Sequence, residues 1–333
     1  MRVGLVGVGR IGVLHAENLR ELPQVEQLVV ADADPGRARA IAEKLGLRAA
    51  DSVDDLLASK PDGIVIAAAT PAHTELVTKA AAAKIATFCE KPLAPTVEGT
   101  KDVIKLADDA GIKLQLGFQR RFDPGYQQAR ERVQSGELGF LHTIVATTMD
   151  QAPPHADYIP TSGGIFRDCA VHDFDIVRWT TGREIVEVYA TGANKGADFF
   201  KQAGDVDTGQ VLVTLDDGTL GTIAVTRYNG AGYDVRLEAH GEKGMVAVGL
   251  DDRAPLRSTE AEALWPAGPA YQTFSERFAI AYAEELKAFV DLIANGGEPK
   301  ATARDALEAL YLAEAAEKSR KERRPVRVEE VRV

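Results

Sequence analysis

Two short stretches of this sequence hold side chains that could move a proton and stabilise charge on an oxygen atom. Lys91 stands in Glu90-Lys91-Pro92, directly after an apolar run that predicts a strand. Asp168 and His172 follow Gly163-Gly164 in a predicted helix, and their spacing places them on one helix face. An imidazole accepts protons near neutral pH, and an ammonium stabilises a developing alkoxide. This set fits the oxidation of an alcohol, in which a base takes the hydroxyl proton as hydride leaves carbon.

Each of these residues also has an alternative interpretation. Lys91 is either a surface lysine paired with Glu90 or a ligand of a substrate oxygen, and its place at a strand end favours the second. His172 alone could be a structural histidine. Asp168 could either orient the imidazole or bind a substrate hydroxyl, and the sequence does not choose. A metal site built from Asp168, Cys169, His172 and Asp173 matches no standard zinc spacing, so we predict no metal.

The N-terminal residues predict the element that places a cofactor beside such groups. A buried-strand pattern runs into Gly7-x-Gly9-x-x-Gly12, which is typical of a dinucleotide pyrophosphate bound at a helix N-terminus. A second apolar run, 27–31, ends at Asp32, where a carboxylate can accept hydrogen bonds from the adenosine ribose. Asp32 favours NAD over NADP, although Arg37 or Arg39 could soften that preference.

The remaining pattern predicts two kinds of sheet. Residues 1–116 alternate apolar runs with helices, which predicts an α/β Rossmann domain with a doubly wound parallel sheet. Later segments alternate in strand fashion, and Asp216-Asp217-Gly218 is a hairpin turn, so the second domain is α+β with a mainly antiparallel sheet. Helices are expected near 274–294 and 303–322. We expect domains at 1–120 and 121–300, with 301–333 returning toward the first.

Composition excludes several classes of protein. The chain has 333 residues and a net charge of −11, and its one basic run, 318–324, suits the last turn of a helix, so nucleic-acid binding is disfavoured. No apolar run approaches the ~18 residues of a membrane span, and a core strand begins where a signal peptide would lie. The two cysteines, Cys89 and Cys169, have no metal-type spacing. We expect a cytoplasmic homo-oligomer, either a dimer or a tetramer.

Several of these motifs occur together in one known family. The chain resembles the glucose-fructose oxidoreductase, inositol dehydrogenase and MocA (Gfo/Idh/MocA) family, and within it the inositol 2-dehydrogenase-like members. The resemblance spans nearly the full chain in the correct order and is carried by Gly7 to Gly12, Asp32, Thr70-Pro71-Ala72-His73, Glu90-Lys91-Pro92, 117–122 and 168–172. It implies a Rossmann domain, an open-faced antiparallel sheet, NAD or NADP as cofactor, and polyols or sugars as substrates.

The resemblance also implies residue roles. Lys91 matches the catalytic lysine, His172 the general base and Asp168 the acid of the same triad. Cofactor positions are Gly7, Gly9, Arg10, Ile11, Gly12, Asp32, Thr70, Pro71, His73, Glu90, Lys91 and Gln119. Arg120 and Tyr233 fall near positions that approach substrate. The segment 148–162 departs from the usual His and Asn pattern, so its substrate candidates, Asp150, Gln151, His155 and Tyr158, come only from their loop location.

The sequence therefore predicts an NAD-dependent dehydrogenase that oxidises a secondary hydroxyl of a cyclic polyol or sugar to a ketone. Three alternatives remain open at this stage. They are an aldose 1-dehydrogenase, an NAD-using glycosidase or lyase in which hydride is borrowed and returned, and a non-catalytic NAD-binding regulator.

Overall fold

A computed structural model describes residues 1–332 and divides them into two compact units. The first comprises Met1–Phe122 and Ile280–Leu307, and the second comprises Asp123–Ala279 and Glu308–Val333. This division differs from the expected boundary at residue 300, because residues 280–300 belong to the first unit. It also places the chain after Leu307 in the second unit.

The first unit is built on a six-stranded parallel sheet in the order β3-β2-β1-β4-β5-β6, the doubly wound order of a dinucleotide-binding domain. Its strands are β1 (Arg2–Val6), β2 (Gln27–Ala31), β3 (Arg48–Ala49), β4 (Gly63–Ile66), β5 (Ala86–Cys89) and β6 (Leu114–Leu116). The middle strands are buried along nearly their whole length, as expected for a sheet covered on both faces. The predicted Rossmann sheet is confirmed.

Helices alternate with these strands, and their ends follow local sequence signals. They are α1 (Arg10–Arg20), α2 (Pro35–Leu45), α3 (Val53–Ala58), α4 (Thr70–Ala82) and α5 (Val97–Ala110). The side chains of Asp34, Ser52 and Thr96 accept backbone N–H bonds at the starts of α2, α3 and α5. Gly46 and Gly111 end α2 and α5 in the left-handed conformation.

The helix α11 (Ala279–Asn295) explains why residues 280–300 group with the first unit. Its Leu286, Phe289 and Val290 are fully buried in one apolar cluster with Val3 and Leu5 of β1. This long-range packing could not be read from the helical pattern of 274–294 alone. That pattern also predicted one helix where the chain forms two, since α10 (Phe274–Arg277) ends just before α11 begins.

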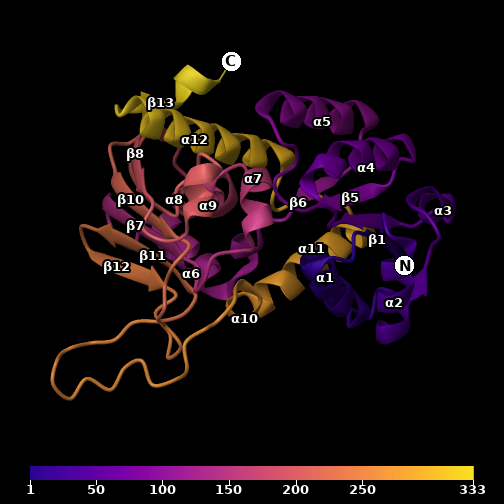
Figure 1. The fold of residues 1–333 in the computed structure, drawn as a ribbon, viewed down its shortest axis with the longest axis horizontal. Helices are drawn as coiled ribbons and strands as arrows, with labels where there is room; N and C mark the ends of the chain where they lie inside the picture. The colour runs from indigo at the N-terminus through magenta and orange to yellow at the C-terminus, as the bar shows by residue number, and fades with distance from the viewer. Residues whose placement is uncertain (333) are drawn as a thin grey trace. The chain divides into compact units, whose positions relative to one another are not determined.

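The second unit contains a seven-stranded sheet in the order β12-β11-β7-β10-β9-β8-β13 (Figure 1). Its strands are β7 (Leu141–Met149), β8 (Ile185–Ala193), β9 (Thr208–Leu215), β10 (Leu220–Thr226), β11 (Asp234–Gly241), β12 (Gly244–Val248) and β13 (Val326–Arg327). All pairs are antiparallel except β7 with β10, so the prediction of a mainly antiparallel sheet is confirmed. The pairing of β13 with β8 holds the C-terminal segment in this unit.

The helices of the second unit include α8, which carries the candidate residue His172. They are α6 (Pro124–Gln134), α7 (Ile159–Ser162), α8 (Val171–Thr181), α9 (Asp198–Gln202) and α10, while α12 (Ala303–Glu322) crosses the division between the units. Helix α8 contacts α6 and β7. The fully buried Asp173 of α8 accepts the Thr148 hydroxyl of β7 at 2.8 and 2.9 Å, which fixes α8 against the sheet.

Candidate active site

The glycine turn between β1 and α1 has the geometry of a phosphate-binding loop. Gly7 has a φ of +93°, and a Cβ on Gly12 would lie 1.9 Å from the Gly7 carbonyl oxygen, so both positions require glycine. Gly9 is the N-cap of α1, provides no side-chain cap, and has nothing within 4 Å of where a Cβ would stand. The space beside Gly9 at the start of α1 is therefore open, next to the exposed Arg10. A dinucleotide pyrophosphate fits this space.

Asp32 lies just beyond the end of β2 and is fixed beside the same turn. One carboxylate oxygen accepts the Val8 amide at 2.8 Å, and the other accepts the Asp34 amide at 2.9 Å. The Arg37 guanidinium lies 3.5 Å away. The two amides orient the carboxylate, which is 9% exposed, so its position suits a ribose hydroxyl that donates hydrogen bonds.

Glu90 and Lys91 follow β5 and rest on a buried polar contact. His15 of α1 lies with Nε2 2.7 Å from one Glu90 oxygen, and the Lys91 amide donates to the other at 3.2 Å. The His15 ring packs edge-on against Phe88 and Tyr282. The contact with His15 of α1 therefore fixes the Glu90 carboxylate. Through the hydrogen bond from the Lys91 amide, Glu90 positions the backbone of Lys91, whose side chain is half-buried.

Three other predicted cofactor positions, Thr70, Pro71 and His73, lie in α4. Thr70 and Pro71 form the first turn of α4, directly beyond β4. The His73 ring nitrogens lie 2.8 Å from the Pro92 carbonyl oxygen and 3.0 Å from that of Ala68. His73 therefore links α4 to the segment that carries Lys91.

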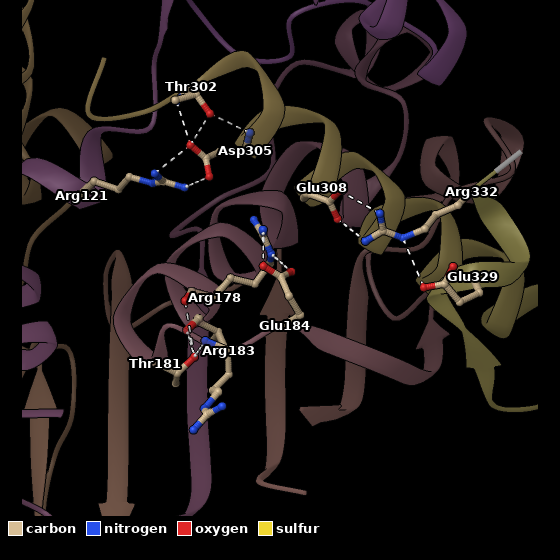
Figure 2. A network of polar contacts seen from close by, with 11 residues as sticks. Arg121, Arg178, Thr181, Arg183, Glu184, Thr302, Asp305, Glu308, Glu329 and Arg332 are labelled. Carbon is tan, nitrogen blue, oxygen red and sulfur yellow. Dashed lines mark hydrogen bonds and ion pairs between the residues drawn. The ribbon is translucent and has the colours of Figure 1, made fainter. Parts of the chain in front are cut away.

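The segment Gln119–Phe122 after β6 is also buried and anchored. Arg121 forms a two-point ion pair with Asp305, at 3.0 and 3.1 Å, and Asp305 accepts the Thr302 hydroxyl at 2.7 Å (Figure 2). Arg120 is 2% exposed and Gln119 is 3% exposed. The Arg121 anchor fixes the backbone of both candidates.

In the second unit, Asp168 and His172 lie on one irregular helical stretch. Residues Phe166–Ala170 form a π-helical turn that leads directly into α8, and His172 is in the first turn of α8. Such turns often mark functional sites in helices. Arg178 in the last turn of α8 pairs at two points with Glu184, at 2.6 and 2.8 Å (Figure 2). This pair fixes the C-terminal end of α8.

Arg227 is the residue that the sequence reasoning missed. Its guanidinium lies 2.6 Å from one Asp168 oxygen and 2.9 Å from an Asp150 oxygen. The Tyr158 hydroxyl donates to the other Asp168 oxygen at 2.9 Å. The structure thus brings three predicted residues, Asp150, Tyr158 and Asp168, together around a buried cation. Arg227 carries no motif, and only strand pairing could have revealed it.

The other substrate candidates of this unit lie in different surroundings. His155 is 81% exposed at its side chain and pairs with Asp157 at 3.3 Å. Gln151 bonds to Gln272 in another loop. Tyr233 is 8% exposed and its amide donates to the Tyr271 carbonyl oxygen at 2.7 Å. None of these contacts joins the Asp168 cluster.

Comparison with known proteins decides the family. Residues 1–118 match the oxidoreductase family with an NAD-binding Rossmann fold, and residues 126–247 match the GFO/IDH/MocA C-terminal domain. The chain belongs to the GFO/IDH/MocA family of oxidoreductases. The resemblance seen in the sequence motifs is confirmed, as is the NAD-binding character of the first unit.

Similar family members are named as inositol dehydrogenases. The chain is 37% identical to myo-inositol 2-dehydrogenase of Thermotoga maritima, covering 99% of both chains, and 41% identical to a myo-inositol dehydrogenase of Streptomyces leeuwenhoekii, covering 96% and 97%. Among solved structures, scyllo-inositol dehydrogenase of Lactobacillus casei with bound NAD(H) and scyllo-inositol has a TM-score of 0.89 at 29% identity, covering 99% of both chains.

Within residues 1–332, no group of three or more His, Cys, Asp or Glu side chains has an arrangement that could hold a metal ion. No helix in that range is both long and apolar enough to cross a bilayer.

Proposed function

We propose that this protein is an NAD-dependent dehydrogenase that oxidises one secondary hydroxyl of a cyclic polyol, of the inositol type, or of a sugar to a ketone. The observation that carries the proposal is the full-length match of this chain to inositol dehydrogenases. The chain also has Lys91, Asp168 and His172 in the motifs described above. A binding protein without activity would not need a base and a cationic oxygen ligand. The non-catalytic alternative therefore has less support.

The residues of the glycine turn and Asp32 fit NAD. The α1 amides beyond Gly9 would hold the pyrophosphate, and the Asp32 carboxylate would accept the ribose hydroxyls. Bound NAD supplies the acceptor for the hydride. A 2′-phosphate would face the charge of Asp32, which supports NAD over NADP. Arg10, Ile11, Thr70, Pro71, His73, Glu90 and Gln119 complete the proposed cofactor set.

The proposed mechanism assigns a separate role to each of three side chains. His172 takes the hydroxyl proton of the substrate as the general base. Lys91 donates a hydrogen bond to the same oxygen and stabilises its developing negative charge. Asp168 accepts hydrogen bonds and holds the reacting groups in the geometry that the reaction requires. Among the substrate candidates, the polar contacts of Asp150 and Tyr158 with the Asp168 cluster support them over His155.

Two further proposals concern the cellular location and the oligomeric state of the protein. We propose a cytoplasmic location, because the chain has only two cysteines, Cys89 and Cys169, and both are buried. We also propose a homo-oligomer, on the general tendency of soluble enzymes.

A substrate panel tests the proposed function directly. Purified protein is mixed with NAD or NADP and with myo-inositol, scyllo-inositol or aldoses, while NADH absorbance and product release are recorded. Oxidation of an inositol with NAD is the expected result, and Lys91→Met should lower kcat by about 10²-fold or more. Lys105→Met, which removes an exposed lysine paired with Asp109, is the matched control. Oxidation of aldoses alone at the anomeric carbon, or product release without net NADH, would contradict the proposal.

A further inference from the structure

Strand register places an aspartate and an arginine side by side at one end of the second sheet. β7 and β10 are parallel neighbours, and their last paired residues are Met149 and Thr226. The next residues along the two strands are Asp150 and Arg227. The Asp150 amide donates to the Thr226 carbonyl oxygen at 2.9 Å, so the pairing continues one step past the strands. The backbone therefore fixes where the Arg227 side chain begins.

From this position Arg227 bridges two carboxylates. It bonds Asp150 through Nη1 and Asp168 through Nη2, at 2.9 and 2.6 Å. Its side chain is 4% exposed, compared with 12% for Asp168 and 24% for Asp150. A guanidinium offers several donors in one plane, which lets a single cation hold both acids.

The electrostatic balance keeps this cation charged. Burial by itself lowers the pKa of Arg227, but the neighbouring acidic groups Cys169, Asp168 and Asp150 outweigh burial and raise that pKa. Burial and the charge of Asp168 also raise the pKa of Tyr158, so its hydroxyl stays protonated and donates to Asp168. The titratable groups that interact with Arg227 include Asp150, Asp168, Cys169, Tyr158 and Asp205.

We propose that Arg227 is a positioning residue that keeps Asp168 an ionised hydrogen-bond acceptor of fixed orientation. The proposal rests on the proposed function of Asp168. One Asp168 oxygen is held by Arg227 and the other by Tyr158, so the carboxylate plane is set from two sides. A carboxylate held beside a guanidinium loses its proton more readily. Asp168 then accepts hydrogen bonds in the reaction and does not donate a proton.

The test compares two buried arginines of the same unit. Arg227→Met removes the cation from Asp168, Arg227→Lys keeps the charge without the two-point geometry, and Arg277→Met removes a different buried pair, with Asp123 at 2.9 Å. Arg277→Met controls for the structural cost of losing a buried cation. Thermal melts establish that each variant is folded.

Two readouts are recorded for each variant. Carbon-13 NMR of aspartate-labelled protein, assigned with Asp168→Asn, follows the titration midpoint of Asp168 without any substrate. We expect the midpoint to rise by about 1 to 3 pH units in Arg227→Met and to stay nearer wild type in Arg227→Lys. In an active enzyme, kcat at its pH maximum should fall about 10-fold or more, because Asp168 is no longer held in one orientation.

The outcomes separate this inference from the proposed function. An Asp168 midpoint in Arg227→Met that stays within experimental error of wild type, or that moves no more than in Arg277→Met, overturns the positioning role. A wild-type protein that oxidises no polyol or sugar overturns the proposed function instead, and the NMR titration still decides whether Arg227 holds Asp168 ionised. Arg227→Met with an unchanged maximum kcat in an active enzyme also counts against the inference.

Discussion

His15 Nε2 lies 2.7 Å from Glu90 Oε1, and His15 is fully buried in the core of the first unit. This contact joins the first helix after the glycine turn to the residue that precedes Lys91.

Replacing His15 should destabilise the protein because Glu90 loses its partner inside the core. His15→Leu keeps much of the ring's apolar volume but leaves the Glu90 carboxylate, 9% exposed, without the imidazole. We expect the free energy of unfolding to fall by about 3 kcal/mol, as for a broken buried pair. Urea denaturation measures this change. His142→Leu, at an exposed position, should stay within about 0.5 kcal/mol of wild type, and equal losses in both variants would contradict the role of the contact.

Two alanine substitutions in the glycine turn should separate folding from cofactor binding. A Cβ on Gly12 would lie 1.9 Å from a carbonyl oxygen, whereas one on Gly9 meets nothing within 4 Å. Gly12→Ala should therefore lower stability by about 3 kcal/mol. Gly9→Ala should leave stability within about 0.5 kcal/mol but weaken NAD binding about 10-fold or more, because the methyl group occupies pyrophosphate space. Thermal melts and NAD titration calorimetry check both, and unchanged NAD affinity in Gly9→Ala would count against the site.

Removal of the Asp32 carboxylate should relax the preference for NAD. Asp32→Ala loses the acceptor for the ribose and the negative charge that would face a 2′-phosphate, while Arg37 remains nearby. We expect kcat/KM for NAD to fall about 10²-fold and the NADP to NAD ratio to rise about 10-fold or more. Steady-state kinetics with both coenzymes measure the ratio. Asp34→Ala, which removes the cap of α2, should cost about 1 kcal/mol of stability and leave the ratio unchanged.

Glu285 should make stability fall as pH rises. It is fully buried in α11, and burial, followed by the charge of Glu90, raises the pKa of its carboxyl well above the usual range. The folded state then holds a proton that the unfolded chain releases near pH 4.5, so stability present below that pH is lost as pH rises toward the folded pKa.

Glu285→Gln removes this titration. Within that window, the free energy of unfolding of wild type should decline relative to the variant by about 1.4 kcal/mol per pH unit. Urea denaturation at pH 5, 7 and 9 measures the difference. Glu284→Gln changes the neighbouring half-exposed carboxylate, which pairs with Lys287, and should run parallel to wild type. Parallel curves for both variants would show that Glu285 does not titrate in this way.

The sequence by itself determined the features that depend on neighbouring residues. The glycine spacing of 7, 9 and 12, the acid at 32 and the caps at Asp34, Ser52 and Thr96 are local signals, because a turn or a helix start is satisfied by residues within one turn of the chain. The order of strands and helices followed from these signals. The motifs also identified the family, which the comparisons confirm.

Only the tertiary structure decided which distant side chains meet. Arg227 is 59 residues from Asp168 and 77 from Asp150, and His15 is 75 residues from Glu90. The first cluster depends on the parallel register of β7 and β10. Register and helix packing are set by the total burial of a sheet or core, so no local pattern specifies them.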